Sequence, residues 1–67
     1  MTQEATLSKG DLVQVRCAQG HIIDDVVWED LGDVVMVCGP AQFTRLSGGY
    51  EAPMPIGFKR EDVALRA

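Results

Sequence analysis

The chain has 67 residues, and its ten acidic and six basic side chains give a formal net charge of −4. A chain of this length holds one domain only, its 46% apolar content is too high for a disordered protein, and no apolar run reaches the roughly 20 residues of a membrane span. The negative charge argues against a protein that holds nucleic acid by net electrostatics, because such binding uses clustered Lys and Arg.

The first eight residues lack hydrophobic periodicity, so we expect residues 1–8 to form a flexible N-terminal arm and residues 9–67 to form a single domain. The segment 1–6 has neither a basic nor an apolar region, which argues against a secretory signal. We therefore expect a cytoplasmic protein with no membrane association.

Residues 12–17 alternate between apolar and polar side chains after a Gly-Asp pair, which predicts a first strand. The apolar side chains on one face of this strand are Val13, Val15 and Cys17. Residues 18–21 are typical of a turn. The adjacent carboxylates Asp24 and Asp25 follow two isoleucines, and we expect them to interrupt any regular strand there.

Residues 26–38 contain two β-branched runs joined by a Gly-containing loop, which predicts a β-hairpin. Val35 and Val37 share one face of its second strand, and Trp28 in the first strand is expected to be core. Both faces of the hairpin are apolar, so that Val27 or its neighbours would present apolar surface on the second face. Because a core this small is marginal, we expect a homodimer.

Residues 39–55 form a long connection for so small a domain. Pro40 and the later Gly48-Gly49 pair favour one or two helical turns over residues 40–47, and two prolines keep residues 50–55 extended. Long connections are often functional. The residues expected to bind a partner are Phe43, Arg45, Tyr50 and Met54. The alternative is that this loop covers an open end of the fold.

The closing segment predicts a strand at residues 56–59, a polar turn at 60–62 and a final apolar strand at 63–65. This order resembles the end of SH3-like barrels. The opening Lys9-Gly10-Asp11, followed by Val13 and Val15, is similar to that of KOW-type members. The resemblance implies an all-β fold, namely a small five-stranded SH3-like barrel with one or two short helical turns. The basic recognition loop of KOW-type domains is replaced here by Asp24 and Asp25.

The two cysteines, Cys17 and Cys38, are expected to be free core thiols, because each ends a β-branched run. The alternative is a zinc site of Cys17, His21 and Cys38 with a carboxylate such as Asp24. Structural zinc usually has paired spacings such as C-x-x-C, which are absent from the sequence, so we expect no metal. No catalytic constellation and no cofactor motif is evident, and His21 is expected to be a solvent-facing turn residue.

These observations favour a non-catalytic interaction module that binds a protein, a peptide or its own copy. One alternative is a KOW-like nucleic-acid-binding domain; its contacts would come from Arg16, Arg45, Lys59 and Arg60. A third hypothesis is an oligomeric enzyme that resembles plasmid-type dihydrofolate reductase, which is similar in its tail to Ala64-Leu65-Arg66. The Val-Gln-Ile-Tyr motif of that enzyme is replaced here by Pro55-Ile56-Gly57-Phe58.

Overall fold

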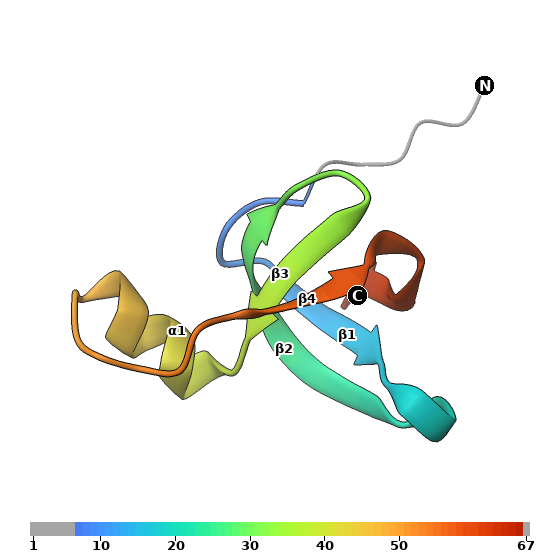
Figure 1. Ribbon diagram of the computed structural model, residues 1–67, viewed down its shortest axis with the longest axis horizontal. Helices are drawn as coiled ribbons and strands as arrows, with labels where there is room; N and C mark the ends of the chain where they lie inside the picture. Colours follow the sequence, from blue (N-terminus) through green and yellow to red (C-terminus); the bar gives the residue numbers. More distant parts are fainter. Residues whose placement is uncertain (1–6, 67) are drawn as a thin grey trace.

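The computed structural model describes residues 7–66, and it is a single five-stranded antiparallel sheet in the order β4-β3-β2-β1-β5 (Figure 1). The strands are β1 (Leu12–Arg16), β2 (Ile22–Asp30), β3 (Val34–Cys38), β4 (Ile56–Lys59) and β5 (Val63–Leu65). The helical elements are the 3₁₀ turn η1 (Ala18–Gly20), the helix α1 (Pro40–Ser47) and the 3₁₀ turn η2 (Arg60–Asp62). The mostly-β class, the five strands and the strand-turn-strand order of the closing segment are confirmed.

The longest strand, β2, continues through the two adjacent carboxylates. Val13 of β1 pairs with Asp25, and Gln14 pairs with Asp24. The expectation that these residues interrupt the strand is therefore wrong. The strand accommodates them because Asp24 is exposed, with Oδ1 3.7 Å from Nε of Arg66, while Asp25 keeps part of its surface in solvent.

Strand β2 connects the two halves of the sheet: its residues 22–26 pair with β1, and its residues 26–30 pair with β3. The pairing shifts between Val27 and Glu29, which leaves Trp28 as an extra residue in a β-bulge. Bulges bend a strand and increase its twist. The two halves of the sheet consequently contribute to one shared core, and β4 passes in front of β1 and β2 in Figure 1.

The core is built mainly from valine. Five valines of β1, β2 and β3 are at most 1% exposed: Val13, Val15, Val27, Val35 and Val37. Phe58 of β4 and Val63 of β5 pack against this cluster at its edge. The predicted inward faces of the first strand and of the second hairpin strand are thus confirmed. Val27 itself lies in the core, so the proposal that it presents a second apolar face is wrong, and the homodimer stays a prediction.

The segment before β1 is tied to the sheet at Leu7. Its side chain is only 8% exposed and belongs to the core, and its backbone N–H donates to Oδ2 of Asp30 at 2.9 Å. Asp30 also accepts the Gly32 N–H at 2.9 Å and forms an ion pair with Arg60. The predicted arm of residues 1–8 therefore ends earlier than expected, because a buried leucine anchors the chain. The rest of it, residues 1–6, lies outside the described residues.

Candidate interaction surface

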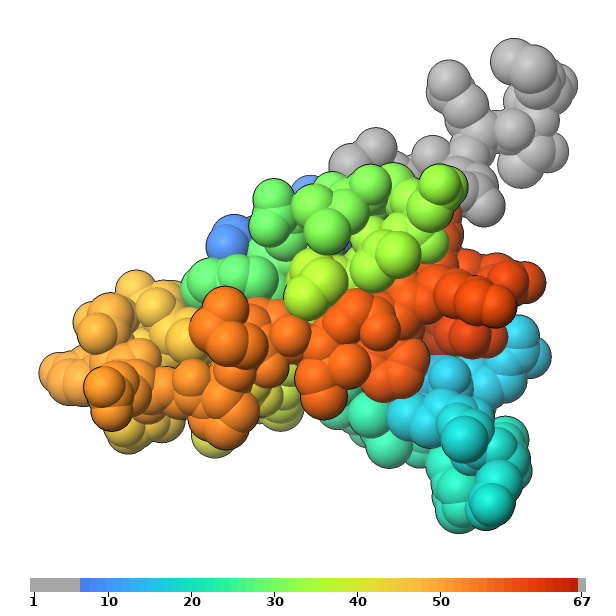
Figure 2. Space-filling view, in the orientation of Figure 1, coloured from blue at the N-terminus to red at the C-terminus, as the bar shows by residue number. Residues whose placement is uncertain are grey.

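The connection between β3 and β4 projects from one end of the molecule. We call residues 39–55 the projecting segment; Figure 2 colours it from yellow-green to orange. Its helix α1 begins at Pro40 and ends before Gly49, whose φ of +82° is readily adopted by glycine. No side chain of α1 is fully buried. Within residues 7–66 no helix is long and apolar enough to cross a membrane.

The loop after α1 is held against the helix by hydrogen bonds from two helical side chains. The side-chain amide of Gln42 donates to the carbonyl of Pro53, and Nε of Arg45 donates to the carbonyl of Glu51 at 3.0 Å. The backbone N–H of Tyr50 donates to the carbonyl of Arg45 at 2.9 Å. The loop backbone therefore has a defined conformation.

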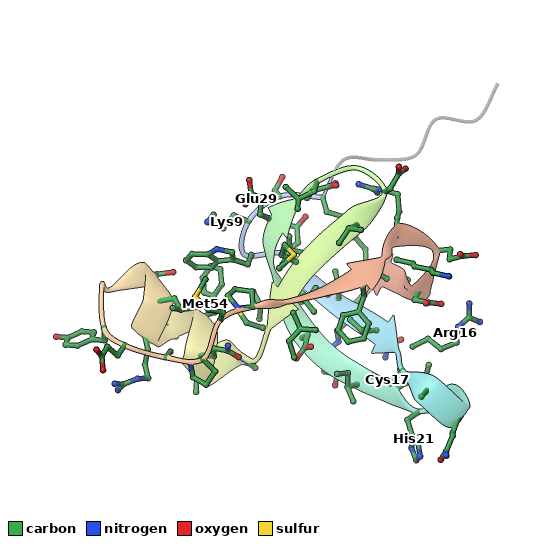
Figure 3. All side chains as sticks on the ribbon, viewed as in Figure 1. Lys9, Arg16, Cys17, His21, Glu29 and Met54 are labelled. Atoms are coloured by element: carbon green, nitrogen blue, oxygen red, sulfur yellow. The ribbon has the colours of Figure 1, made fainter. Side chains whose placement is uncertain are left out.

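Tyr50 of this loop and Arg45 of α1 together form one exposed surface. The guanidinium carbon of Arg45 lies 5.8 Å from the centre of the Tyr50 ring, and Tyr50 is 67% exposed. A Cβ at Gly48 would lie 3.2 Å from that ring, so the absence of a side chain there leaves room for it. Met54 is 76% exposed and lies nearer the sheet, where the loop leads into β4 (Figure 3).

Phe43, the fourth residue predicted to bind a partner, packs inward instead. Its ring meets Trp28 edge to face, with 5.7 Å between centroids and 77° between planes. The ammonium of Lys9 lies 3.6 Å from the centre of the Trp28 ring. Trp28 is half-buried and is not part of the core cluster, so the prediction of a core tryptophan is wrong. The bulge is the reason, because it turns Trp28 out of the regular alternation.

A second group of residues, none of which was predicted to bind a partner, lies on the core-facing side of the sheet. The register pairs Leu65 with Val13, Ile23 with Val15 and Ile56 with Val37, and in each pair the valine is buried while its partner is exposed. Asp25 is the polar member of this group, since it also pairs with Val13. Burial, and then the neighbouring Asp24, raise the pKa of Asp25.

The two cysteines are free thiols, as predicted. Cys17 packs against the core, while Cys38 is buried beside Val26, its partner in β2. Burial raises the pKa of Cys38 most, Asp25 adds to this, and Lys9 opposes it. No three His, Cys, Asp or Glu side chains in residues 7–66 are grouped as metal ligands. His21 lies at the outer end of the β1–β2 turn, remote from Met54 (Figure 3).

Most basic side chains are already engaged within the chain. Arg16 donates to Asp62 at 3.1 Å, and among the described residues Arg60 also pairs with Asp30 and Arg66 with Asp24. An open depression of about 490 Å³ is lined by charged side chains of both signs around Val34; these are Asp33, Lys59, Arg60 and Glu61. A smaller one of about 200 Å³ contains the Arg16–Asp62 pair. Neither brings together a nucleophile and a base.

No protein-family model, no curated protein and no solved structure matches the chain. The function of the projecting segment is therefore inferred from its own geometry and chemistry.

Proposed function

We propose that the protein is a non-catalytic interaction module that binds a protein or peptide partner through its projecting segment. One observation carries this proposal: Met54 and Tyr50, at 76% and 67%, are the most exposed large apolar side chains of residues 7–66, and they sit on a loop whose backbone is fixed to α1. Aromatic and Met side chains are enriched in protein interfaces. A loop fixed before binding loses less entropy on association.

We also propose that the bent sheet is a half-open SH3-like barrel. The strand order β4-β3-β2-β1-β5 and the short turn η2 between β4 and β5 support this, because the barrel resemblance rests on the same closing elements. A module of this kind displays its binding residues on connections between strands, and the projecting segment is the longest connection here.

The distribution of charge favours a protein partner over nucleic acid. Three of the six basic residues pair with carboxylates of the same chain: Arg16, Arg60 and Arg66. Lys9 covers the Trp28 ring, and Arg45 is directed to the loop. Phosphate binding needs clustered cations that are free to displace counterions, so this arrangement disfavours a KOW-like activity.

The test is capture of partners from the native host by immobilised protein, compared with Tyr50→Ala and Met54→Ala variants. Both side chains are mostly exposed, so the melting temperature should stay nearly unchanged while capture weakens. Leu31→Ala is the matched control, because Leu31 is a similarly exposed apolar residue, at 57%, in the separate β2–β3 turn. Unchanged capture by the two loop variants would reject the proposed surface. Salt-sensitive binding of nonspecific DNA or RNA would instead favour the nucleic-acid function.

A further inference from the structure

The core-facing side of the sheet has an apolar border that stays in contact with solvent. We call this border the open rim; it consists of Ile23, Asp25, Ile56 and Leu65. Its three apolar members are 40%, 64% and 53% exposed, respectively, although each sits opposite a valine that is at most 1% exposed. These side chains thus lie on the same face of the sheet as the core valines, but the sheet does not cover them.

The rim also contains an acidic group that has no counterion. Asp25 ends the cross-strand row Leu65–Val13–Asp25, and the row Val27–Val37–Ile56 begins two residues further along β2 on the same side. It is half-buried, and no hydrogen bond or ion pair joins its carboxylate to any other described residue. By contrast, Asp24, Asp30 and Asp62 each pair with an arginine. Burial already disfavours the charge of Asp25.

Any partner that covers the rim must also satisfy this carboxylate. Leaving a buried charge unpaired is costly, whereas a basic group that donates to it converts the cost into a charge-assisted hydrogen bond. We infer that the open rim docks an apolar segment of a protein partner that carries a Lys or Arg placed to meet Asp25. This inference rests on the proposed interaction function and specifies the chemistry of the partner. The rim continues from the projecting segment, since Ile56 follows Met54 by two residues.

A second copy of the chain fits the rim less well. An isologous interface places the same patch on both sides of a two-fold axis, so two Asp25 carboxylates would be buried in one interface. No cation of the described rim would pair with either of them. Each copy also has a formal charge of −4, which adds repulsion.

The experiment uses three synthetic peptides that alternate valine with lysine, with glutamine or with glutamate. Binding to the full chain is followed by backbone amide chemical shifts and by fluorescence anisotropy of the labelled peptides. The Val-Lys peptide should shift the amides of rim residues and bind the most tightly. Asp25→Asn should weaken the binding of the Val-Lys peptide by about tenfold or more. This is the change in affinity that corresponds to the loss of one hydrogen bond to a charged group.

Asp33→Asn is the matched control, because it removes one exposed negative charge elsewhere and should leave binding within about twofold if general electrostatics is minor. Ile56→Gln should weaken the binding of the lysine and glutamine peptides to the same extent. Because Ile56 is highly exposed, the variant protein should still fold.

Equal binding of all three peptides, equal losses for Asp25→Asn and Asp33→Asn, or no binding would overturn the inference. Concentration-dependent shifts at the rim without peptide would overturn it too, in favour of a second copy. If host-partner capture depends on Tyr50 but not on Asp25, the rim inference fails while the proposed function stands. If capture depends on Asp25 alone, the rim stands and the projecting segment is not the site.

Discussion

The ring of Phe43 on helix α1 meets the edge-to-face partner Trp28 in the bulge of β2, with 5.7 Å between ring centroids. This contact joins the projecting segment to the sheet. It lies beside Gly10, where an added Cβ would be 3.7 Å from the Phe43 ring, and beneath the ammonium of Lys9. A residue predicted to bind a partner and a residue predicted to fill the core thus form a contact between helix α1 and the sheet.

We expect a double-mutant cycle of Trp28→Leu and Phe43→Leu to give a coupling energy of about 0.5–1.5 kcal/mol, the usual value for an aromatic pair. Urea unfolding of the four proteins measures it. Lys9→Met should weaken stability further by roughly 0.5–1 kcal/mol, because it removes the charge over the indole but keeps the apolar stem. Strictly additive losses for Trp28 and Phe43 would mean that the two rings do not support each other.

The ion pair of Asp30 predicts a loss of stability in acid. The pKa of Asp30 is lowered from 3.8 to about 2. The largest cause is the side-chain hydrogen bond from Arg60, and the backbone N–H groups of Gly32 and Leu7 contribute next. Because its pKa is lower in the folded than in the unfolded protein, ionised Asp30 stabilises the fold above about pH 4. This contribution is lost as the pH falls towards about 2 and the carboxylate is protonated.

Chemical unfolding at stepped pH tests this directly. Asp30→Asn should be less stable than the wild type at neutral pH, and the difference should shrink between pH 4 and 2 as Asp30 of the wild type is protonated. Asp33→Asn, an exposed change in the same turn, should show no such convergence. A constant gap between wild type and Asp30→Asn over this range would contradict the prediction.

Gly57 in β4 lies under two side chains of β3. A Cβ there would be 2.9 Å from Cγ1 of Val34 and 3.1 Å from Sδ of Met36. Met36 is flexible, but Val34 is β-branched and stiff at χ1, so Gly57→Ala should destabilise the fold by about 1–3 kcal/mol. Adding Val34→Ala should restore part of the loss. Gly39→Ala is the control, because its φ is −69° and its surroundings are open, and it should cost less than about 1 kcal/mol.

The two thiols should differ in reactivity. Cys38 is 3% exposed, and burial raises its pKa, whereas Cys17 is only partly buried. Since the thiolate is the nucleophile, iodoacetamide should label Cys17 faster than Cys38 in the native protein and both at similar rates in denaturant. Peptide mapping by mass spectrometry reads out the two rates. Faster native labelling of Cys38 would show that its strand opens readily.

Much of the secondary structure follows from local sequence. The hairpin of β2 and β3 was predictable because two valine runs flank a turn at Gly32, whose φ is +95°. Helix α1 was predictable because Pro40 begins it and Gly48-Gly49 ends it. The unbroken course of β2 through Asp24 was not, since pairing to β1 outweighs the low strand preference of aspartate.

The features of the candidate site also fall into those that local sequence predicts and those that depend on tertiary structure. The exposure of Tyr50 and Met54 follows from a loop with glycines and prolines, which the sequence alone displays. The inward packing of Phe43, the burial of Leu7 and the unpaired carboxylate of Asp25 depend on which distant strands meet and where a bulge falls. Local periodicity determined the valine core of this protein, because alternation is a short-range property. Tertiary structure alone decided its open rim, because whether a core-facing residue is covered depends on how far the sheet closes around it.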